Sequence, residues 1–104
     1  MKLKFPKTVT IGDHIFKVVT DNSHSGGSFS YAEGKITIGT KRLSTQPCSV
    51  LNVIIHEIKE IIQVEQYTRY ERPDEEGNYE FHYSHKEHTE LCSRLAGILD
   101  QFIV

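Results

Sequence analysis

The stretch that decides the fold lies in the middle of the chain and reads Val50-Leu51-Asn52-Val53-Ile54-Ile55-His56-Glu57-Ile58-Lys59-Glu60-Ile61-Ile62-Gln63-Val64. Its apolar residues recur at helical spacing, and at 100° per residue they fill an arc of roughly 200°. Pro47 suits the first turn of such a helix. The pattern predicts a helix buried over more than half of its circumference, with Asn52, Lys59 and Gln63 on the exposed side.

The residues before this helix predict strands. Thr8 to Ile11 and His14 to Thr20 are rich in β-branched residues, and Gly12-Asp13 between them is typical of a hairpin turn. A second hairpin is expected from the segments 29–31 and 35–38, which alternate between the two sides of a strand. The N-terminal part should therefore form an antiparallel sheet of three or four strands with one face covered.

The residues after the helix predict a further hairpin and a second helix. Tyr79 to Tyr83 alternates in polarity and follows a polar loop at Pro73 to Asn78, and the partner strand is expected near Tyr70. Ser84 and Glu87 match a capping box that opens a C-terminal helix. The predicted fold class is α+β, with an N-terminal antiparallel sheet, a central helix, a β-hairpin insertion and a C-terminal helix.

Length and composition predict one small domain over residues 1–104. The net charge is only −2 and there is no extended basic run, which argues against binding to nucleic acid or to a membrane surface. No apolar stretch is long enough to span a bilayer, and the N-terminus lacks the apolar region of a signal peptide. Cys48 and Cys92 are too few and too isolated for a disulfide framework. We therefore expect a cytoplasmic protein with reduced cysteines.

Three polar residues of the central helix do not fit a simple core helix. Glu57 lies inside the apolar arc, where an unpaired carboxylate costs several kcal/mol unless it is paired, protonated or linked to a metal. His56 and Glu60 are four positions apart on one face and can converge on one point. On the C-terminal helix, the same construction puts His88 at the centre of the apolar arc and His85 within it. We therefore expect the two helices to face each other with these side chains between them.

The motif His56-Glu57-Ile58-Lys59-Glu60 is comparable with H-E-x-x-H, in which two histidines hold zinc and the glutamate is the general base. Here Glu60 replaces the second histidine, and a carboxylate is also a zinc ligand. His88 would complete a set of two histidines and one carboxylate. The predicted ligands are thus His56, Glu60 and His88, with Glu57 as the base. Whether His85 is a fourth ligand stays open, and a closed four-ligand site would be structural.

These residues resemble those of the very short zincin-type metallopeptidase domains, gluzincin-like in layout, that occur as small phage-encoded and bacterial proteins. The likeness covers most of the chain, in three segments: Gly34–Ile38 as a strand beside the site, Val53–Ile58 as the active-site helix, and Arg94–Leu99 as the end of the C-terminal helix. It implies a zinc ion, a water activated by Glu57, and an edge strand that holds an extended peptide. His56 and Glu57 match the family motif directly, whereas Glu60 departs from it.

The predicted function is hydrolysis of a peptide bond in a peptide or protein substrate. Glu57 would take a proton from the metal-bound water and pass it to the leaving amine. Its apolar surroundings should raise its pKa towards the working pH. Tyr83 or His82, at the start of the C-terminal helix, is a candidate for stabilising the oxyanion.

Two other function classes stay open. The first is a catalytically inactive domain that binds a metal and serves as an interaction module. The second is a non-haem iron oxygenase, because two histidines and one carboxylate also suit ferrous iron. Zinc is the expected metal, with iron or manganese as alternatives.

Overall fold

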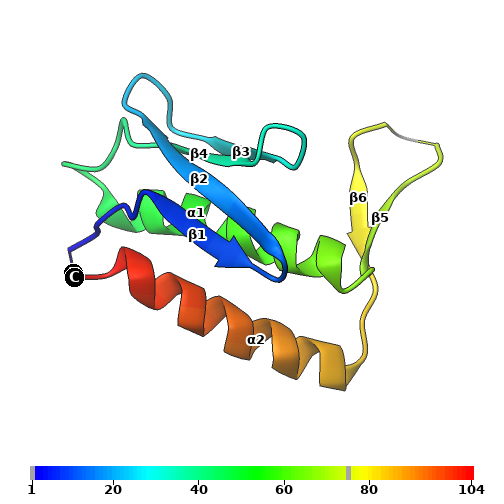
Figure 1. The fold of residues 1–104 in the computed structure, drawn as a ribbon. Helices are drawn as coiled ribbons and strands as arrows, with labels where there is room; N and C mark the ends of the chain where they lie inside the picture. Colours follow the sequence, from blue (N-terminus) through cyan, green and yellow to red (C-terminus); the bar gives the residue numbers. More distant parts are fainter. Residues whose placement is uncertain (1, 75) are drawn as a thin grey trace.

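The computed structural model describes residues 2–74 and 76–104, and it has the expected α+β architecture (Figure 1). The sheet strands are β1 (Thr8–Ile11), β2 (His14–Asp21), β3 (Gly27–Ser30) and β4 (Lys35–Gly39). They are followed by helix α1 (Pro47–Glu65), the hairpin strands β5 (Arg69–Glu71) and β6 (Tyr79–Phe81), helix α2 (His85–Leu99) and a short 3-10 helix, η1 (Asp100–Phe102).

The four-stranded sheet has the order β1-β2-β4-β3 and is mixed. The hairpins β1–β2 and β3–β4 are antiparallel as predicted, but β2 and β4 run parallel, so the fully antiparallel sheet expected from the sequence is wrong at its centre. The reason is that β3 does not pair with β2, because β4 lies between them in the sheet. Since β4 runs antiparallel to β3, it runs parallel to β2. This order leaves β3 as an edge strand, with one side free of partners in the sheet.

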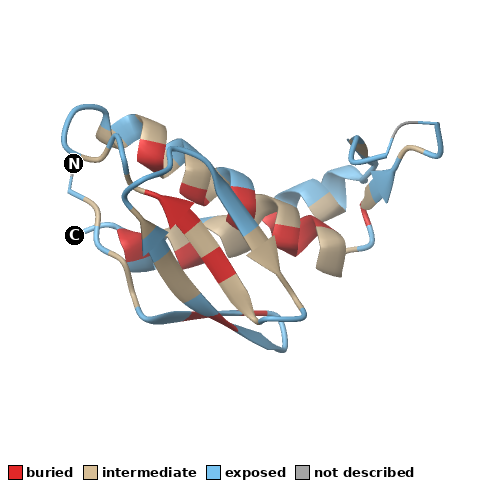
Figure 2. Ribbon diagram, turned by 90° about the horizontal axis from the view of Figure 1, so that it is seen from above, coloured by how far each residue is buried: buried red, intermediate tan, exposed pale blue. Residues whose placement is uncertain are grey.

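Both helices lie on one side of the sheet, with α1 packed against β3 and β4 and α2 alongside α1 (Figure 1). The strands alternate as predicted, so that one face of the sheet supplies Val9, Ile11, Phe16, Ile36 and Ile38 to the core (Figure 2). From α1 the core receives Val50, Ile54, Ile58, Ile61 and Ile62. Burying each large aliphatic side chain stabilises the fold by about 1.5–3 kcal/mol, so this shared core fixes α1 against the sheet.

The C-terminal end of α1 differs in one respect from the prediction. Gln63, expected on the exposed side, is only 2% exposed. The chain turns back over it, because Tyr67 adopts a left-handed conformation (φ 59°) and Thr68 then donates to the Gln63 carbonyl from both its amide and its hydroxyl. A helical wheel considers only the residues of the helix itself. It therefore does not show that the segment after the helix folds back onto Gln63.

The start of α2 has the predicted capping box. The Glu87 amide donates to Ser84 Oγ (3.2 Å), and the Ser84 amide donates to Glu87 Oε1 (2.9 Å). Gln66 Nε2 donates to the Glu87 carbonyl (3.0 Å), which fixes the first turn of α2 beside the C-terminal end of α1.

The predicted hairpin insertion is also present, and β5 and β6 stand beyond the end of α1 (Figure 1). The predicted loop Pro73–Asn78 falls between the two strands. Its residue Glu75 lies outside the described residues. Cys48 and Cys92 are both free and exposed. Among the described residues, no helix combines the length and apolar character needed to cross a membrane.

Candidate metal centre

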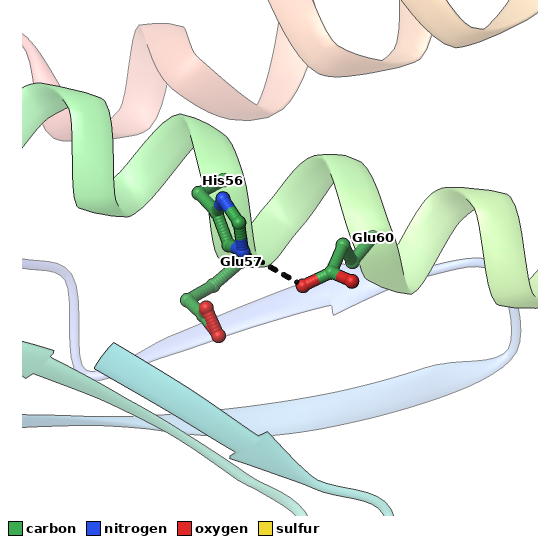
Figure 3. Close-up of side chains that lie close together, drawn as sticks. All are labelled: His56, Glu57 and Glu60. Atoms are coloured by element: carbon green, nitrogen blue, oxygen red, sulfur yellow. Dashed lines mark ion pairs between the residues drawn. The ribbon is translucent and has the colours of Figure 1, made fainter. Parts of the chain in front are cut away.

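His56, Glu57 and Glu60 come together on the middle turns of α1, as their spacing predicted (Figure 3). His56 Nε2 lies 3.0 Å from Glu60 Oε2, which is the pairing expected four positions apart on a helix. One potential ligand atom from each of the three residues lies within 4.8 Å of the other two. The His56 side chain is largely exposed, so the group is accessible from outside.

Glu57 is the buried member of the group, with 5% of its surface exposed. Its side chain points away from α2 and towards the strands (Figure 3). Burial raises the pKa of this carboxyl group above its ordinary value; nearby His56 lowers it, Glu60 raises it and Arg69 lowers it. Both the burial of Glu57 and the direction of its pKa shift were predicted from the apolar arc.

Arg69, the first residue of β5, forms an ion pair with the group. Its Nε lies 3.4 Å from Glu60 Oε1, so Glu60 is placed between an imidazole and a guanidinium. The guanidinium carbon also lies 3.6 Å from the ring centroid of Tyr79 and 5.4 Å from that of Phe29. Arg69 Nε is buried without a hydrogen bond, because its geometry towards Glu60 is that of an ion pair only.

Sequence reasoning missed Arg69. Its position depends on how the hairpin folds back towards α1, and the only local signal was a strand expected near Tyr70. Nothing in the spacing of residues 69 and 60 indicates that they meet, because the turn at Tyr67 is what brings them together.

The group opens into a hollow of about 680 Å³ between α1, β3 and the hairpin. This volume is within the usual range for small-molecule sites. One wall carries His56, Glu57, Glu60 and Arg69, and the other walls are rich in aromatic side chains, namely Phe29, Tyr31, Tyr79 and Phe81. From the four-stranded sheet, β3 contributes residues to the lining of the hollow. The segment Gly34–Ile38, expected beside the site, instead forms most of β4, one strand further into the sheet.

Among the described residues, the group consists of His56, Glu57 and Glu60, and His88 is not part of it. The expectation that His88 and His85 face the core is wrong, because both are exposed. The bond from Gln66 to Glu87 places the start of α2 beside the end of α1, and His56 lies ten residues earlier, about 15 Å along the helix axis. The three clustered side chains also project from α1 on the side away from α2 (Figure 3).

The two candidates for oxyanion stabilisation lie outside the hollow. Tyr83 stacks on the His88 ring, with the centroids 5.9 Å apart and the planes 10° apart. His82 Nε2 lies 3.1 Å from Glu80 Oε2, on a largely exposed pair of side chains. Neither Tyr83 nor His82 lines the hollow beside Glu57.

The donor set fits a divalent metal ion. One imidazole nitrogen and two carboxylates are ligands that zinc accepts at about 2.0–2.2 Å, so two atoms on one ion lie at most about 4.4 Å apart. Separations within 4.8 Å therefore need only small side-chain rotations. The same mixture of nitrogen and oxygen donors also suits ferrous iron or manganese.

Comparison with known proteins adds no assignment, since no protein-family model, no curated protein and no solved structure matches the chain. The likeness to short zincins stays a prediction that rests on the motif.

Proposed function

We propose that this chain is a metal-dependent hydrolase of peptide bonds, with His56 and Glu60 as ligands of a zinc ion and Glu57 as the general base. The observation that carries the proposal is the buried carboxylate of Glu57 beside an accessible histidine–glutamate pair at the wall of a hollow. A buried acid with a raised pKa in such a position is typical of a functional site.

Each of the three residues has a distinct part in the reaction. His56 and Glu60 hold the ion, and Glu57 accepts a proton from the attacking water and returns it to the leaving amine. A bound zinc ion would polarise the scissile carbonyl and lower the pKa of the water. With Glu57 as the base, His56 and Glu60 supply two protein ligands, one fewer than the three usual at a catalytic zinc site, so the other positions would be open to water and substrate.

The surroundings of the group fit an extended peptide. The free side of β3 offers backbone donors and acceptors next to Glu57, and extended peptides bind such edges by strand addition. The aromatic walls can cover apolar side chains of the substrate. Arg69 balances part of the negative charge of Glu60 and Glu57 when no ion is bound.

The alternative is an interaction module that binds a metal without catalysis. It shares His56 and Glu60 with the first proposal, but it gives Glu57 no role in proton transfer. Non-haem iron chemistry is the less favoured third class, because its ligands usually lie on strands, whereas His56 and Glu60 lie on a helix. The two leading proposals therefore differ in the effect of Glu57→Gln.

The test begins with tag-free protein that is stripped with a chelator and reloaded separately with zinc, manganese or ferrous iron. Bound metal is measured by elemental analysis, and cleavage is measured with a mixed library of quenched fluorescent peptides. We expect His56→Ala and Glu60→Ala to lower metal binding. Glu57→Gln should keep the metal but lose cleavage by about 10²–10⁴-fold, the usual contribution of a general base.

Glu90→Gln is the matched control, because Glu90 is an exposed glutamate of α2. It should retain both metal and activity. Metal binding without cleavage in the wild type would favour the interaction module. Cleavage that survives Glu57→Gln, or a metal content per chain that is the same in the wild type, His56→Ala and Glu60→Ala, would contradict the proposed site.

A further inference from the structure

The first turns of α2 carry three side chains of types that can bind a metal ion, apart from the centre on α1. His85, His88 and Cys92 are spaced three and four residues apart, so they lie along one face of the helix. All three are exposed. Cys92 is a free thiol that takes no part in a disulfide or in the buried core.

The distance between His88 and Cys92 is the one that a shared metal requires. His88 Nε2 lies 3.7 Å from Cys92 Sγ. With bonds of about 2.0–2.1 Å to nitrogen and 2.3 Å to sulfur at the tetrahedral angle, two such ligands of one zinc ion lie about 3.6 Å apart. The separation of these two atoms therefore already matches that of two ligands on one ion.

The neighbours of His88 hold its ring in this orientation. The Tyr83 ring lies nearly parallel to the imidazole, with the planes 10° apart and the centroids 5.9 Å apart. The His85 ring is tilted by 38° to that of His88, with the centroids 6.4 Å apart. A rotation of the exposed His85 side chain can bring a third ligand to the same ion. The capping box at Ser84 and Glu87 keeps the underlying turn helical.

We infer that His88 and Cys92, joined by His85, form a second metal site on α2 for zinc or another borderline to soft cation such as cuprous copper. Thiolate and imidazole ligands select these ions over magnesium, calcium and manganese. On binding, Cys92 forms a metal–sulfur bond and releases its proton to solvent, with no change in oxidation state. This site does not depend on the function proposed for His56, Glu57 and Glu60.

The test compares the alkylation rates of the two exposed cysteines by peptide mass spectrometry, with zinc and with chelator. Cys48 is an internal control, because it is free and exposed but lies in the first turn of α1, about 27 Å along that helix from the end that contacts the start of α2. At a zinc concentration about tenfold above the dissociation constant, alkylation of Cys92 should slow about tenfold, whereas that of Cys48 stays the same. His88→Ala should remove this protection, and His56→Ala should not.

A spectroscopic measurement makes the result independent of reagent access. Cobalt(II) bound to Cys92 should give the intense near-ultraviolet absorption of a thiolate–metal bond in Cys48→Ser, and this band should be absent from Cys92→Ser. Far-ultraviolet circular dichroism checks that each variant keeps its helices.

Three results would overturn the inference: no protection of Cys92 in the wild type, equal protection of both cysteines, or loss of protection in His56→Ala. The last result would mean that His88 joins the centre on α1, as the sequence alone predicted. Failure of peptide cleavage, by contrast, would leave the α2 site unaffected.

Discussion

Gly27 of β3 faces Glu57 of α1 so closely that a Cβ atom added to Gly27 would lie 3.1 Å from Glu57 Cγ. The same atom would lie 2.6 Å from Val53 Cγ1 and 3.0 Å from the Thr37 carbonyl oxygen. The glycine thus allows the helix to approach the edge strand and to enclose the carboxylate between them. Without this close approach, Glu57 would be hydrated and its pKa would lie nearer the ordinary value.

Gly27→Ala should therefore destabilise the protein by about 1–3 kcal/mol, the usual cost of adding atoms to a packed contact. The free energy of unfolding from urea titrations measures the effect. Gly26→Ala is the control, because a Cβ at Gly26 would meet no atom within 4 Å. Equal effects of the two substitutions would show that the contact with α1 is not the cause.

Glu57→Gln should stabilise the metal-free protein at neutral pH. Burial raises the pKa of Glu57 in the folded state, so the folded protein binds this proton more tightly than the unfolded chain. The contribution to stability is then full below the pKa of the unfolded state and is lost as the pH rises through the folded pKa. Glutamine keeps the shape of the side chain and cannot ionise.

The measurement is the melting temperature of both proteins in chelator from about pH 4 to pH 8, which spans the titration of a raised carboxyl group. The advantage of Glu57→Gln should grow with pH. Glu90→Gln provides the matched substitution at an exposed position. An advantage that is independent of pH would mean that ionisation of Glu57 does not limit stability.

Arg69→Ala should loosen the hairpin. The guanidinium links β5 to Glu60 and stacks against Tyr79, and cation–π contacts of this kind contribute about 0.5–2 kcal/mol. Limited proteolysis should therefore cut the segment between β5 and β6 faster in Arg69→Ala. Arg69→Lys should restore the charge but only part of the protection, since an ammonium group lacks the planar stacking surface.

Arg72→Ala is the control on the same hairpin. Arg72 pairs with Asp74 and Glu80 through exposed side chains, and such pairs contribute about 0–1 kcal/mol. Arg72→Ala should therefore change the rate of proteolysis little. If it accelerates proteolysis as much as Arg69→Ala does, the contact between Arg69 and Glu60 does not hold the hairpin.

Ile58→Ala should destabilise the protein by about 2–5 kcal/mol, because Ile58 is completely buried and truncation leaves a cavity. Ile15→Ala removes the same atoms from a side chain of β2 that is 67% exposed. Its effect on the free energy of unfolding should be much smaller. Similar losses in the two variants would show that α1 does not pack as described.

The features that could be predicted from the sequence depend on neighbours along the chain. The apolar period of residues 50–64 indicated α1 and the burial of Glu57, and the i, i+4 spacing indicated the pair of His56 and Glu60. The capping box at Ser84 likewise involves residues three positions apart. These relationships are fixed by helix geometry, whatever the rest of the chain does.

The features that could not be predicted depend on which elements meet. A helical wheel assigns His88 to the apolar side of α2. It does not show that α1, which packs against α2, ends beside Glu87, so that His88 stays exposed. Strand patterns do not distinguish parallel from antiparallel pairing, so the insertion of β4 beside β2 was missed. Arg69 reaches Glu60 only because the chain reverses at Tyr67.

The two ends of the chain pair with each other through three backbone contacts. Leu3 pairs with Ile103, the Lys4 amide donates to the Phe102 carbonyl, and the Val104 amide donates to the Lys2 carbonyl. Closing a loop of this length costs more chain entropy than forming any contact among β3, β4 and α1. We therefore expect the terminal pairing to form late in refolding and to exchange its amide hydrogens first, while the acidic centre on α1 is already assembled.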